Sequence, residues 1–90
     1  MSTRLKQDIS MGPNLQKLRL NAGLSQEAVV AKLTLMGITW VSREILSQME
    51  LGKYSVRISI LLALKEVYAV GFDDFFQGLT WRDIPIDEIK

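Results

Sequence analysis

The chain has neither cysteine nor histidine among its 90 residues. Without cysteine it can form no disulfide framework and no thiolate metal site. Without histidine, a zinc or iron site would need carboxylates alone, and no cluster of Asp and Glu in the sequence suggests one. The most common general base of enzymes is missing as well. We therefore expect no metal, no cofactor and no catalytic activity.

Long apolar runs are also missing. No run approaches the roughly 20 residues that a membrane-spanning helix needs, and the polar segment 1–10 lacks the apolar centre of a signal peptide. Apolar residues nevertheless make up 48% of the chain, which is enough for one core in a domain of this length. We expect one small soluble domain in the cytoplasm.

The net charge is only +1, but the charges are unevenly distributed. Residues 1–57 carry eight Lys or Arg against four Asp or Glu, a net charge of +4. Residues 58–90 carry three against six, a net charge of −3. If the protein binds a polyanion, the first part of the chain should make the contact. The alternative is that such an asymmetry arises by chance in a small domain.

Apolar spacing and turn residues predict five helices. Gly23 and Gly52 suit the left-handed residue that ends a helix. Ser25 and Ser42 suit the position before a helix, where a hydroxyl accepts an otherwise unpaired amide proton. We expect the helices at about 13–22, 26–35, 43–51 and 57–69, with a short fifth helix after Gly71.

The same periodicity selects the side chains that should face one shared core. Between the second and third helices, Ile38, Trp40 and Val41 are too apolar to be left in water, so we expect an ordered turn there. The helical core positions should be Leu15, Leu18, Ala22, Val29 or Val30, Leu33, Met36, Leu46, Met49, Ile60 or Leu61, Leu64, Tyr68, Phe72, Phe75 and Phe76.

These patterns divide the chain into three parts. Residues 1–12 show no periodicity, which predicts a flexible N-terminal arm. Residues 13–79 should form the helical domain. Pro85 argues against a helix through residues 80–90, so we expect a short non-helical C-terminal tail.

Six short motifs in this order resemble the Cro and phage-repressor (XRE-like) helix-turn-helix family. The resemblance covers residues 13–77 and implies an all-α, five-helix lambda-repressor-like fold. About six extra residues lie between Gln26 and Glu50, as in the subgroup with a lengthened turn between the second and third helices. The motifs are Leu18-Arg19, Gly23-Leu24-Ser25-Gln26-Glu27, Val30-Ala31-Lys32-Leu33, Ser42-Arg43, Met49-Glu50-Leu51-Gly52-Lys53 and Ala69-Val70-Gly71-Phe72-Asp73-Asp74-Phe75-Phe76.

The resemblance implies that the third helix enters the DNA major groove. Its exposed face should carry Arg43, Glu44, Ser47 and Gln48 to the bases. Arginine can bond guanine through two hydrogen bonds, glutamine can bond adenine, and a carboxylate can accept from the amino group of cytosine. The alternative is an ordinary solvated helix face.

Further contacts are implied around this helix. Gln26 resembles a family residue that bonds a backbone phosphate, and Lys53, Tyr54 and Arg57 are expected phosphate contacts. The alternatives are surface charge for Lys53 and Arg57 and loop packing for Tyr54. A second set has structural roles: Arg19 and Glu50 should form an ion pair, and Trp40 should pack the long turn.

We therefore expect a sequence-specific transcriptional regulator of double-stranded DNA, with repression as the expected direction and a homodimer as the expected assembly. The tail from Thr80 to Lys90 would serve as a dimer contact or as an intramolecular cover. The alternative is a protein-interaction module on the same fold, such as an antitoxin or a regulatory partner, because fold alone does not settle function.

Overall fold

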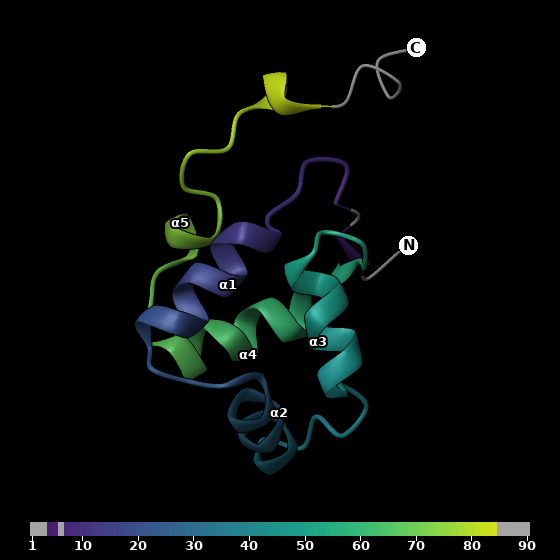
Figure 1. Cartoon of the computed structure of the whole chain (residues 1–90), viewed down its shortest axis with the longest axis vertical. Helices are drawn as coiled ribbons and strands as arrows, with labels where there is room; N and C mark the ends of the chain where they lie inside the picture. The colour runs from purple at the N-terminus through teal and green to yellow at the C-terminus, as the bar shows by residue number, and fades with distance from the viewer. Residues whose placement is uncertain (1–3, 6, 85–90) are drawn as a thin grey trace.

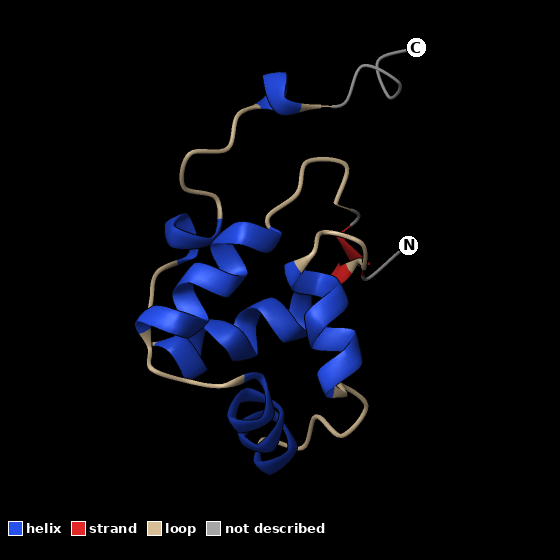
Figure 2. Cartoon of the chain, in the orientation of Figure 1, coloured by secondary structure: helices blue, strands red, loops and turns tan. Residues whose placement is uncertain are grey.

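The computed structural model of the chain describes residues 4–5 and 7–84 and is mostly helical, as the sequence predicts (Figures 1 and 2). None of the helices in this part is long and apolar enough to cross a membrane. Two two-residue strands, β1 (Arg4–Leu5) and β2 (Val56–Arg57), form one antiparallel pair. The elements are β1 (Arg4–Leu5), α1 (Gly12–Asn21), α2 (Gln26–Leu35), α3 (Arg43–Glu50), β2 (Val56–Arg57), α4 (Ile58–Tyr68), α5 (Phe72–Phe75) and the 3-10 helix η1 (Trp81–Asp83).

Two serine caps fix where α2 and α3 begin. The Ser25 hydroxyl accepts a hydrogen bond from the backbone amide of Ala28 at 3.1 Å, and the Ser42 hydroxyl accepts one from Ile45 at 3.2 Å. Each hydroxyl satisfies an amide that has no partner inside its own helix. The starts of both helices are therefore at the predicted residues.

The core gathers around α4, which crosses the middle of the domain with α1, α2 and α3 around it (Figure 1). Most of the predicted inward positions are buried. Side chains with almost no exposed surface come from every one of the five α-helices and from β2: Leu15, Val29, Leu33, Leu46, Met49, Val56, Ile60, Leu64 and Phe75.

Four predicted core positions are wrong. Ala22, Met36 and Phe76 follow directly after the last residues of α1, α2 and α5 and are exposed. The helical period no longer sets the direction of a side chain beyond the end of the helix. Phe72 is 42% exposed and stands at the first position of the one-turn helix α5, with the Lys65 ammonium 5.2 Å from its ring centre.

Part of the segment predicted as a flexible arm is attached to the domain. The Gln7 amide nitrogen donates to the carbonyl oxygens of Tyr54 at 2.7 Å and Met49 at 3.3 Å, and its oxygen accepts from the Met11 amide at 3.0 Å. β1 also pairs with β2. The N-terminal segment is therefore fastened to the chain that leaves α3. Residues 1–3 and 6 lie outside the described part.

The start of the C-terminal tail contains a helical turn, so the prediction of a wholly non-helical tail is wrong. Thr80 and Asp83 form a capping box at the start of η1: the Thr80 hydroxyl accepts from the Arg82 amide at 3.2 Å, and the Asp83 carboxylate accepts from the Thr80 amide at 2.9 Å. A single turn ends before Pro85, so the proline does not oppose it. Residues 85–90 lie outside the described part.

Candidate nucleic-acid interface

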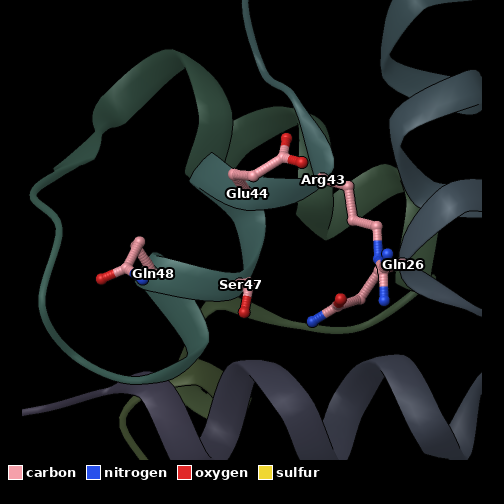
Figure 3. Close-up of a pocket in the computed structure, with 5 residues that line it drawn as sticks. All are labelled: Gln26, Arg43, Glu44, Ser47 and Gln48. Atoms are coloured by element: carbon pink, nitrogen blue, oxygen red, sulfur yellow. The ribbon is translucent and has the colours of Figure 1, made fainter.

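A surface depression of about 180 Å³ lies where α2 and α3 meet (Figure 3). The first residue of each helix contributes to it, so two helix N-termini, which carry partial positive charge, face the same space. The structure thus brings together all four predicted base contacts and one predicted phosphate contact. The lining residues are Gln26, Arg43, Glu44, Ser47 and Gln48.

Helix α3 has two distinct faces. Leu46 and Met49 are fully buried and fix the helix against the core. Arg43, Glu44 and Gln48 are exposed. Because residues three and four apart share a side of a helix, burial of one face determines that the polar face is presented outward.

A buried ion pair lies next to the depression and is connected to it through Gln26. The Arg19 guanidinium donates two hydrogen bonds to the Glu50 carboxylate, of 2.7 Å and 3.1 Å. It donates a third to the Leu24 carbonyl oxygen at 3.0 Å. The hydrogen bond to Glu50 raises the pKa of Arg19 above its ordinary value, so the pairing further stabilises the charged guanidinium. The pair joins α1 to the end of α3.

The same carboxylate also orients Gln26. The Gln26 amide nitrogen donates to Glu50 at 3.1 Å. A glutamine amide carries two N–H groups, so this bond fixes the side chain while one N–H remains to serve a further acceptor. Figure 3 shows the Arg43 side chain extending from α3 toward Gln26, whose amide end points toward Ser47.

Arg43 already has a partner in the protein. Its Nε lies 3.0 Å from a carboxylate oxygen of Glu27, and both side chains are about two-thirds exposed, at 64% and 65%. Glu44 adds a second carboxylate to the same depression. A ligand that binds Nε of Arg43 must displace Glu27, and a ligand on the two terminal nitrogens shares the guanidinium with that carboxylate.

The remaining predicted phosphate contacts lie elsewhere. Lys53 and Tyr54 are exposed beyond the end of α3, and neither lines the depression. The Arg57 guanidinium lies 4.4 Å from the centre of the Trp40 ring, where the two form a cation–π contact. Trp40 is thus in contact with the chain that leads into α4, but it is 38% exposed, so the expectation that the turn would shield it from water is wrong.

Sequence reasoning missed the role of Glu27. An acidic residue in the first turn of a helix is common because it interacts favourably with the helix dipole, so Glu27 gave no separate signal. Its partner is sixteen positions away in the sequence, and only the arrangement of α2 beside α3 brings the two together. Among the described residues, carboxylates form no group that could hold a metal ion.

Comparisons of the chain with models of known protein families, with curated proteins and with solved structures found no match.

Proposed function

We propose that this protein is a sequence-specific regulator that binds double-stranded DNA, with α2 and α3 acting as a helix-turn-helix unit. Repression is the expected direction, and two copies would bind paired half-sites. One observation carries the proposal: Gln26, Arg43, Glu44, Ser47 and Gln48 converge on one exposed surface at the start of α3.

The chemistry of this surface suits base recognition. Arg43 and Gln48 offer the two side-chain types that form paired hydrogen bonds with guanine and adenine in the major groove. Gln26, held by Glu50, has an N–H for a phosphate oxygen, and the two helix N-termini favour an anion at the same place. Lys53, beyond the end of α3, would contact the backbone and fix the position of the helix.

The direct test is selection of binding sites from random duplexes, followed by binding measurements over a range of salt concentrations. We expect enrichment of a short motif in two copies. The logarithm of the binding constant should fall linearly with the logarithm of salt concentration, by about 0.9 for each phosphate neutralised. No duplex binding even at low salt would refute the proposal.

Substitution of Arg43 by alanine should remove discrimination at one base pair. The expected loss on the selected site is about 1–3 kcal/mol, with much less loss on a duplex altered at that base pair. The matched comparison is Lys53→Ala, which should weaken all duplexes alike and reduce the salt dependence. Titration of both variants against both duplexes separates the two roles. Equal losses for Arg43→Ala on the two duplexes would contradict base contact by Arg43.

Substitution of Glu27 by glutamine should strengthen DNA binding by about two- to fivefold, the range expected for release of one exposed ion pair. The reason is that Glu27 occupies the Arg43 guanidinium at 3.0 Å. Glu66→Gln is the control, because it makes the same change in net charge on α4, away from the depression. Equal gains for the two variants would mean that net charge, rather than release of Arg43, causes the effect.

The acidic side chains beside Arg43 favour one other candidate function. Glu27 and Glu44 leave the immediate surroundings of Arg43 with more negative than positive charge, which suits a basic segment of a partner protein. A protein-interaction module, such as an antitoxin or a regulatory partner, would use the same surface. In that case no duplex would be selected, and the Glu27→Gln variant would bind its protein partner less tightly.

A further inference from the structure

A second surface feature lies at the start of α1. A groove of about 400 Å³ runs between the segment that precedes α1 and the segment that follows α5. Its lining is mainly apolar, with one carboxylate, and is formed chiefly by Asp8, Ile9, Met11, Phe76, Leu79 and Trp81.

One wall of this groove is held firmly in place. The Asn14 amide nitrogen, on α1, donates to the carbonyl oxygens of Phe75 at 2.9 Å and Gln77 at 3.0 Å. These bonds fasten the end of α5 to α1. Phe76 lies between the two anchored residues and is still 44% exposed, so the groove keeps an aromatic wall in contact with solvent.

Beyond Leu79 the chain leaves the helical body, and η1 stands apart from α1 and α5 (Figure 1). None of the three residues of η1 is buried, although a capping box fixes the start of the turn. Trp81, the largest of them, is 72% exposed. Trp81 lines the groove together with the exposed Phe76, so the two aromatic side chains belong to one apolar surface. Contiguous exposed apolar surfaces of this kind mark interaction sites.

We propose that the groove and Trp81 form a reciprocal contact between two copies of this chain. In a two-fold pair the two grooves face each other, and each Trp81, at the edge of its own groove, packs against Phe76 of the other copy. A self-complementary contact of this kind is what two-fold symmetry requires, because the same patch serves on both sides. The proposal does not depend on DNA binding.

Charge complementarity favours a second copy over other occupants. Arg82 follows Trp81 directly, and its guanidinium lies 5.2 Å from the centre of the Trp81 ring. Asp8 lines the groove. When Trp81 of one copy packs against the groove of the other, the neighbouring Arg82 comes close to Asp8 of that other copy. The chain therefore supplies both the apolar and the ionic contacts of the proposed dimer.

The size of the contact limits its strength. About six residues a side is well below the 20–30 residues a side of a standard stable interface. We therefore expect a weak dimer with a dissociation constant in the micromolar range or above. Such a dimer forms at high protein concentration and dissociates into monomers at low concentration.

Sedimentation equilibrium of the whole chain without DNA tests the contact, over protein concentrations from about 10 μM to about 1 mM. We expect a monomer–dimer equilibrium whose dissociation constant rises at least about tenfold in Trp81→Ala. Leu35→Ala is the control, because Leu35 is 88% exposed and lies on α2, outside the groove. Circular dichroism melting checks that both variants fold.

A charge exchange tests the geometry. Arg82→Glu and Asp8→Lys should each weaken the dimer, and the double variant should restore it. A monomer at every concentration would mean that Trp81 covers its own groove or nothing at all, and would overturn the proposal. A dimer that Trp81→Ala leaves unchanged, or that Leu35→Ala abolishes, would overturn it as well. Because DNA is absent, failure here is separate from failure of the proposed function.

Discussion

Replacing Glu50 with alanine should lower the free energy of unfolding by about 3–5 kcal/mol, because Arg19 would be left as an uncompensated buried charge. The Arg19 and Glu50 side chains are only 9% and 4% exposed and share two hydrogen bonds. Removal of the carboxylate also takes away the acceptor of Gln26. Urea unfolding followed by circular dichroism measures the loss.

The exposed pair of Arg43 and Glu27 is the matched control for this prediction. It has the same chemistry and a similar separation, 3.0 Å, but both side chains are about two-thirds exposed. Glu27→Ala should therefore change the free energy of unfolding by less than about 1 kcal/mol. Equal losses for Glu27→Ala and Glu50→Ala would contradict the argument that burial sets the cost.

A further variant separates the net value of the buried pair from the cost of breaking it. Joint replacement by apolar residues, Arg19→Met with Glu50→Leu, removes both charges together, and such exchanges are often neutral or stabilising. We expect this double variant to recover most of the stability lost in Glu50→Ala. Its Gln26 would still lack the carboxylate that orients it, so DNA affinity should stay below that of the wild type.

The helices and most of the core could be predicted from the sequence because local rules determine them. Ser25 and Ser42 cap at the expected positions, and apolar spacing placed Leu46, Met49 and Leu64 inside. Each of these predictions needs only neighbouring residues. The expectation that α2 and α3 act together came instead from the family resemblance, because the spacing of residues does not tell how two helices are arranged.

The features that sequence reasoning missed depend on contacts between distant segments. Gln7 is one polar residue in a segment with no periodicity, and two of its three partners, Met49 and Tyr54, lie more than forty positions away. The hydrogen bonds that attach it involve backbone carbonyl groups, which every residue has. The Glu27–Arg43 pair depends on how α2 and α3 meet, and the exposure of Phe76 depends on where α5 ends. The spacing of residue types predicts neither the meeting of two helices nor the exact end of a helix.

Substitution of Gly12 by alanine should lower the free energy of unfolding by about 1–3 kcal/mol or more, as overpacking of a close contact does. Gly12 begins α1 and lies against the end of α3, where an added Cβ would come within 2.7 Å of the Glu50 carbonyl carbon and 2.8 Å of the Gly52 nitrogen. These are backbone atoms, so no side chain can move aside to make room.

The expected destabilisation by Gly12→Ala is opposite in sign to the usual effect of such an exchange in a helix. At an unstrained helical position, exchange of glycine for alanine usually stabilises a protein by about 0.4–1 kcal/mol, because it restricts the unfolded chain. Gly71→Ala is the control for added bulk alone: Gly71 precedes α5 in extended backbone, and its added Cβ would meet one atom, a carboxylate oxygen of Asp74, at 3.8 Å, an ordinary contact. A stabilised Gly12→Ala would show that α1 and α3 are farther apart than the structure has them. If α1 moves instead, α3 loses its support at Glu50, and DNA affinity should fall together with stability.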